Sequence, residues 1–182
     1  MHSQITWHNQ SGSGVRSLLP DWMVKSATAG LAAGMVMAMW SMIVAAVAGQ
    51  GFWAPVRAIT AMLFGKEHAG GGWDPASVIG GAMLHMAFSM MAGVGFAAII
   101  GRFTTRLAVA GYVAAAMLWG LALWAINTFA VGPAMPGGEL MTSAMPAWSW
   151  FVGHLMFGAG LGLLYALWRR GVTRLASQQP SA

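Results

Sequence analysis

The chain has 182 residues, of which 58% are hydrophobic and only 7% are charged. A water-soluble domain of this size would carry more charge on its surface, so the composition indicates an integral membrane protein. Lys and Arg outnumber Asp and Glu by nine to four. These basic residues flank apolar runs, which argues against an exposed basic face that binds nucleic acid. The lack of cysteine excludes disulfides, thiolate-bound iron–sulfur clusters, c-type haem attachment and a thiol nucleophile.

Four apolar stretches are long enough to cross a bilayer as helices, which takes about 20 residues each. They cover residues 27–49, 78–101, 107–131 and 147–168. Their apolar residues do not alternate with polar ones as barrel strands require, so each stretch is predicted to be a helix. We therefore expect an all-α protein with a four-helix transmembrane domain at 27–170, an N-terminal segment at 1–26 and a tail at 171–182. The polar N-terminal segment predicts no cleaved signal peptide.

The basic residues predict which side of the membrane each loop faces. Seven of them lie before the first span, between the second and third spans, or after the fourth: Arg16, Lys25, Arg102, Arg106, Arg169, Arg170 and Arg174. Only Arg57 and Lys66 lie on the other side. Because cytoplasmic loops carry an excess of Lys and Arg, we expect both termini and the middle turn to be cytoplasmic.

Both predicted outer loops contain a short stretch suited to the membrane surface. In the first loop, residues 55–64 begin with a proline and are otherwise apolar except for Arg57, which predicts a short interfacial helix. In the second loop, residues 139–143 are predicted to form one or two helical turns. The chain thus has the order span, surface element, span, and repeats it once in the same orientation.

Sequence matches support a tandem repeat of two-span units. A shift of 69 residues aligns His85 with His154, Phe88 with Phe157, and Gly93 with Gly162. The match between the first and third spans is weaker and rests on Ala-Met pairs near Trp40 and Trp119. Chance matching among Ala, Gly and Met is the competing explanation. Parallel repeats would be related by an axis along the membrane normal.

His85 and His154 are the leading candidates for a functional site, because ionisable side chains at membrane depth are costly and commonly have a task. Each lies about 12 Å into its span, so the two should be level in the outer half of the bilayer. A bis-histidine arrangement on the second and fourth helices resembles cytochrome b bundles, and predicts one haem b or another metal centre. In this interpretation Gly120 clears an edge of the macrocycle and Arg57 meets a propionate.

Two alternatives compete with the haem hypothesis. In the structural alternative, the histidines only make interhelical hydrogen bonds, to Ser89, Asn127, Thr128 or a carbonyl. In the transport alternative, the protein is a small-solute or copper channel, since thioethers are soft ligands. Eight methionines of the first two spans are candidate copper ligands: Met35, Met37, Met39, Met42, Met83, Met86, Met90 and Met91. Their ordinary helical spacing favours packing, and the spans hold no carboxylate for ion coupling.

The glycine-rich opening of the first span and the sequence Gly49-Gln50-Gly51-Phe52-Trp53, followed by Pro55, resemble a family of small uncharacterised bacterial four-span membrane proteins. The resemblance implies the fold and a bacterial inner membrane, and it implies no activity. The sequence thus predicts a redox or anchor subunit with a histidine-bound centre, or else a non-catalytic assembly subunit or a channel. It does not indicate an enzyme acting alone. The expected partners are the lipid bilayer and either other membrane subunits or further copies of the chain.

Overall fold

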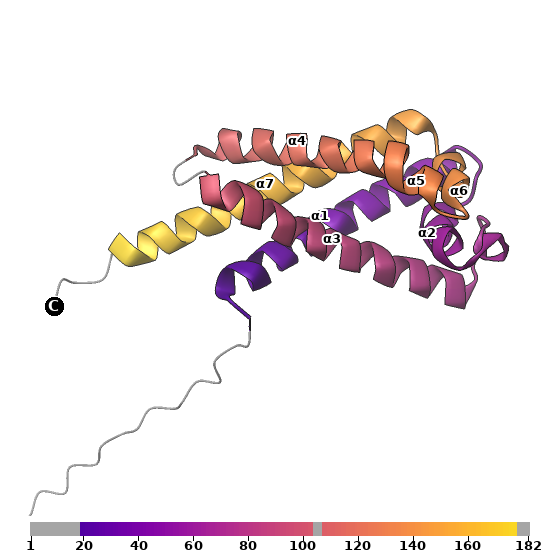
Figure 1. The fold of residues 1–182 in the computed structure, drawn as a ribbon, viewed down its shortest axis with the longest axis horizontal. Coiled ribbons are helices and arrows are strands. Elements are labelled where there is room, and N and C mark those ends of the chain that lie inside the picture. Colours follow the sequence, from indigo (N-terminus) through magenta and orange to yellow (C-terminus); the bar gives the residue numbers. More distant parts are fainter. Residues whose placement is uncertain (1–18, 104–106, 178–182) are drawn as a thin grey trace, which may run out of the picture.

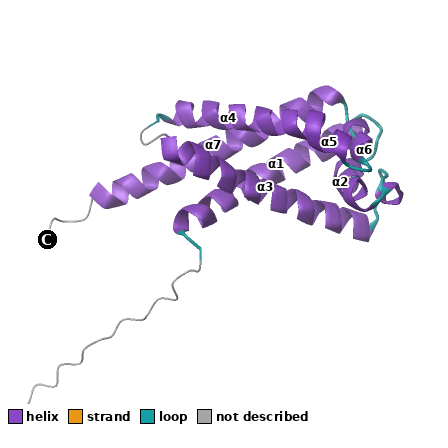
Figure 2. Ribbon diagram, viewed as in Figure 1, coloured by secondary structure: helices purple, strands orange, loops and turns teal. Residues whose placement is uncertain are grey.

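The computed structural model describes residues 19–103 and 107–177, and every regular element in these ranges is helical (Figure 2). The α-helices are α1 (Asp21–Val47), α2 (Ala54–Phe64), α3 (Pro75–Phe103), α4 (Val109–Ile126), α5 (Gly132–Ala134), α6 (Gly138–Ser143) and α7 (Ala147–Ser177). A 3-10 turn, η1 (Lys66–His68), follows α2, and a π-helical turn, η2 (Asn127–Val131), joins α4 to α5. The predicted all-α fold is confirmed.

Four helices are long and apolar enough to cross a membrane: Asp21–Val47, Pro75–Gly101, Val109–Ala134 and Ala147–Arg170. They correspond to the four predicted spans. The first begins six residues before the predicted start at Ala27, directly after Pro20, and Asp21 pairs with Lys25 one turn later at 3.4 Å. The last helix continues to Ser177, past the predicted Trp168. Hydropathy locates the membrane crossing, whereas a helix continues until its backbone is interrupted, so α1 begins before its apolar stretch and α7 ends after its own.

The spans form two pairs that meet through the central helices α1 and α7. Helix α3 packs along α1, α4 packs along α7, and α1 packs against α7. By contrast, α3 and α4 have few backbone contacts with each other, and they diverge toward the end of the bundle that carries α2, α5 and α6 (Figure 1). The start of α1, the end of α3, the start of α4 and the end of α7 lie toward the opposite end of the molecule (Figure 1).

Glycines bring the helices of each pair into backbone contact. A Cβ atom on Gly93 of α3 would overlap the Ser26 carbonyl oxygen and the Gly30 backbone of α1. In the second pair, a Cβ atom on Gly120 of α4 would overlap the His154 carbonyl oxygen of α7. Small residues at such crossings let membrane helices approach closely, which is the main source of their association in lipid.

These contacts also bear on the predicted repeat. Gly34 of α1 lies against Ser89 and His85 of α3, and Gly120 of α4 lies against the His154 carbonyl of α7. Each histidine therefore lies on the second span of its pair, next to a glycine of the first. Gly34 of the first span and Gly120 of the third therefore hold equivalent places in the two pairs. The sequence comparison had instead aligned the first and third spans near Trp40 and Trp119. The equivalent glycine positions agree with the predicted tandem two-span repeat.

The surface elements close the wide end of the bundle. Helix α2 agrees with the predicted stretch 55–64 to within one residue, and it packs on α3 and α6. Most of its side chains are buried, among them Val56, Ala58 and Ile59. Helix α6 covers the predicted turn at 139–143. Both therefore form a lid of protein over this end of the spans.

Replacing Gly93 with Ala should destabilise the protein, because the new methyl group meets backbone atoms of α1 that cannot move aside. Overpacking of this kind typically costs about 1–3 kcal/mol. Gly160→Ala is the matched control, since a Cβ atom there would make ordinary contact with the Ala33 side chain at 3.4 Å. Thermal unfolding of the purified variants in detergent measures the difference. Equal melting temperatures for both variants would contradict the proposed backbone contact.

Candidate functional site

His85 lies on α3 and its imidazole points at the backbone of α1. Its Nε2 atom is 3.0 Å from the Gly34 carbonyl oxygen. A carbonyl oxygen can only accept, so Nε2 carries the proton and donates it. The neutral ring therefore presents Nδ1 as a bare acceptor, which has no partner among the described residues. The Ser89 hydroxyl, one turn further along α3, donates to the His85 carbonyl at 2.7 Å.

His154 lies on α7 with 4% of its surface exposed, and both of its ring nitrogens are occupied. Nδ1 is 2.9 Å from the Trp150 carbonyl oxygen and therefore donates to it. Nε2 is then an acceptor, and the Asn127 side-chain nitrogen lies 3.4 Å from it. These bonds are the kind that the structural alternative predicted, and Asn127 was one of the partners it named. The two histidines thus bond to different elements outside their own helices, His85 to α1 and His154 to the π-helical turn η2.

The other residues assigned to a haem site have protein partners of their own. At Gly120, the backbone of α7 fills the space that was expected for a macrocycle edge. Arg57 donates to the carbonyl oxygens of His68, Ala69 and Gly72 at 2.9, 2.9 and 3.1 Å. No group of three or more His, Cys, Asp or Glu side chains suited to a metal gathers within the described ranges. The haem and metal assignments therefore stay predictions.

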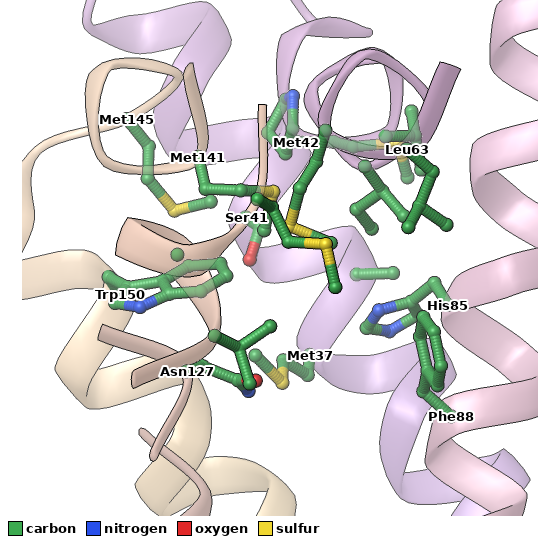
Figure 3. Close-up of a pocket in the computed structure, with 18 residues that line it drawn as sticks. Met37, Ser41, Met42, Leu63, His85, Phe88, Asn127, Met141, Met145 and Trp150 are labelled. Carbon is green, nitrogen blue, oxygen red and sulfur yellow. The ribbon is translucent and has the colours of Figure 1, made fainter. Parts of the chain in front are cut away.

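A cavity of about 340 Å³ lies where α3 and α4 diverge, beneath α2 and α6 (Figure 3). Ala38 and Ser41 of α1, His85 and Phe88 of α3, and Trp150 of α7 line it. The remaining lining residues are Met37, Met42, Pro55, Val56, Ile59, Met62, Leu63, Asn127, Val131, Gly132, Met135, Met141 and Met145. In Figure 3, Trp150 lies on one side, His85 and Phe88 on the other, with Met42 and Met141 between them.

The methionines that line the cavity are mostly not those singled out in the sequence. Of the eight considered there, only Met37 and Met42 reach it. Met35, Met39, Met83, Met90 and Met91 are instead exposed on the outside of the bundle. The other four lining methionines come from the surface elements, which a search of the spans misses. The signal available in the sequence was the presence of Met in both loops that join the paired spans.

The cavity adjoins the outside of the bundle between α3 and α4. Phe88, which lines it, is 45% exposed, as expected at a rim. On the other side of the opening the π-helical turn carries Asn127 and Val131. Below the cavity, the Trp119 indole of α4 donates to the Ala92 carbonyl of α3 at 3.1 Å and closes the gap. In a membrane this opening would face lipid.

A polar cluster around the first turn of α3 fixes the lid to that helix. The Ser77 hydroxyl and amide both donate to the Asp74 carboxylate, while the His68 Nδ1 atom donates to the Ser77 oxygen at 3.0 Å. The Ser77 hydrogen bonds, followed by the charges of Arg57 and His68, lower the pKa of Asp74 below its ordinary 3.8. On the other side of the lid, Lys66 and Glu139 form an ion pair at 2.5 Å.

No protein-family model, no curated protein and no solved structure matches the chain. Fold and composition define a class, the multi-pass α-helical membrane proteins.

The Asp74 cluster predicts an acid-sensitive lid. The pKa of Asp74 is lowered in the folded state, so its stabilising effect is complete above 3.8 and is lost as the pH falls through the lower folded-state value. We expect Asp74→Asn to lower the melting temperature at neutral pH and to flatten its decrease in acid. Thermal unfolding of both proteins across the acid range measures this. Parallel pH profiles for the two proteins would show that Asp74 is not responsible.

Proposed function

We propose that the protein binds a small, mostly apolar molecule from the bilayer in the cavity beneath α2 and α6. The observation that carries the proposal is the cavity itself, about 340 Å³ of space with apolar walls and few polar atoms. Small-molecule sites typically have about 300–1,000 Å³ and a mainly hydrophobic lining with a few orienting polar groups. Ser41, His85 and Asn127 are such groups here.

Lateral entry from lipid fits the position of the opening. A ligand dissolved in the membrane would reach the cavity between α3 and α4, past Phe88, without crossing the lid. Conduction has less support, because the core between the cavity and the other end of the bundle is tightly filled, with Phe96 and Leu161 both 0% exposed. Binding therefore explains the arrangement better than a channel for small solutes.

Copper is the less favoured ligand. Six methionines and one histidine line the cavity, and thioethers do suit Cu(I). A single ion, however, needs ligands that converge on one point, and it would leave most of 340 Å³ empty. Flexible methionine side chains also form adaptable walls around an apolar molecule. The volume thus favours a molecule over an ion.

The orientation is part of the proposal. The excess of basic residues at one end supports termini in the cytoplasm and a cavity in the outer half of the membrane, and the sequence resemblance supports a bacterial inner membrane. An anchor or assembly subunit within a larger complex, or a homo-oligomer, is compatible with a bound molecule of this kind.

Binding of one haem b by His85 and His154 is the second candidate, motivated by the pair itself. It would require the Gly34 and Asn127 bonds to both Nε2 atoms to be exchanged for iron, or ligation through other ring atoms. Expression with added haem tests it. A Soret band that disappears in both His85→Ala and His154→Ala would support haem ligation, and a sample without such a band would exclude it.

Filling the cavity should block the proposed site. We expect an apolar phenyl diazirine to label Met42 and Trp150 on illumination, in addition to the lipid-facing surface. Ala38→Phe, which adds a ring to the cavity wall, should reduce labelling of these two residues at least severalfold, measured by mass spectrometry of peptides.

The matched control is Met83→Phe, which adds the same ring at a position that is 70% exposed. It should leave the labelling of Met42 and Trp150 unchanged. Wild-type protein that is labelled only on exposed residues would contradict the proposal.

A further inference from the structure

We infer that the cavity recognises a neutral aromatic molecule with a hydroxyl group, of the phenol or quinol class. The inference rests on the proposed function and deepens it. It follows from which hydrogen-bonding atoms are left over once the partners within the protein are assigned. Those atoms are mainly acceptors, so they select a ligand that donates.

His85 supplies the first acceptor. Because Nε2 donates to Gly34, the lone pair of Nδ1 has no partner in the described part of the chain. The ring is largely enclosed and lines the cavity. A polar atom so placed in an apolar site binds most favourably to a donor, since the alternative is an unmet hydrogen bond.

Asn127 supplies the second acceptor through the same logic. His154 donates from Nδ1 to Trp150, so its Nε2 atom must accept, and the Asn127 amide nitrogen must face it. The amide oxygen is thereby left as an acceptor without a partner among the described residues. The Ser41 hydroxyl, also on the cavity wall and without a described partner, can both donate and accept.

The walls favour an aromatic body for the ligand. Phe88 and Trp150 lie on opposite sides of the cavity, with methionine side chains between them (Figure 3). Thioether sulfurs make favourable contacts with aromatic rings, and aromatic rings pack well against one another. A carbonyl compound without a hydroxyl group, such as an oxidised quinone, would bring its acceptor oxygens to His85 and Asn127 and would be disfavoured.

A pair of probes that differ only in the donor tests the inference. Binding of para-butylphenol and of para-butylanisole is measured by equilibrium dialysis against the full chain in lipid nanodiscs, with empty nanodiscs to subtract partitioning. We expect the phenol to bind about tenfold more tightly, the effect of one well-made hydrogen bond.

His85→Gln is the informative variant. The glutamine amide nitrogen can still donate to Gly34, and the amide oxygen is then displaced from the position of Nδ1, so the preference for the phenol should fall severalfold while the anisole still binds. Ser89→Ala, which removes a hydroxyl from the same helix without touching the cavity, should keep the preference. Ser41→Ala provides a second variant that should reduce it if His85→Gln does not fold.

The outcomes separate the two claims. Equal binding of phenol and anisole by the wild type would overturn the donor preference and leave the proposed function intact. Binding of neither probe, together with no diazirine labelling inside the cavity, would overturn both. A preference that survives in both His85→Gln and Ser41→Ala would show that other atoms recognise the hydroxyl, and would also overturn the assignment.

Discussion

Backbone contact within two helix pairs is the constraint on which the rest of the structure depends. Lipid offers no hydrophobic force to hold apolar helices together, so association relies on close packing at small residues. Gly30 meets Gly93 in one pair, and Gly120 meets Gly158 in the other. Two pairs held this tightly and joined through α1 and α7 leave α3 and α4 free to diverge, and the cavity lies in the resulting space.

The two histidines have different roles in the structure. His154 has both nitrogens satisfied inside the bundle, which makes it part of the framework that positions Asn127. Interhelical hydrogen bonds in membranes are worth about 0.6 kcal/mol on average, so such a bond orients a side chain more than it stabilises the fold. In His85, Nε2 donates to the Gly34 carbonyl, whereas Nδ1 has no partner among the described residues and belongs to a ring that lines the cavity. The likeness of their sequence surroundings therefore reflects a common packing position against a glycine, and their chemistry diverges from there.

Much of the fold could be predicted from the sequence, because its causes are local. Four apolar stretches of sufficient length specify four spans, and a proline followed by apolar residues specifies α2. The site was harder to predict, because it depends on how far α3 and α4 diverge and on where the lid rests. The methionine stripe of α3 was visible in the sequence but lies mostly outside the bundle, whereas Met62, Met141 and Met145 enter the cavity from short helices. Only their packing in three dimensions distinguishes the two groups.

The π-helical turn at Asn127–Val131 has a consequence for how the outer end is built. A π turn holds one more residue than the α-helical turn it replaces, so everything that follows is rotated by about 100° about the helix axis. That rotation sets the direction in which the chain leaves α4, and with it the placement of α5 and α6. Deleting a single residue there would restore an ordinary helix. Met135 and α6 would then leave α4 in a different direction about the helix axis, while the four membrane-spanning helices kept their length. The rotation introduced by this one turn therefore determines where α6 packs in the lid.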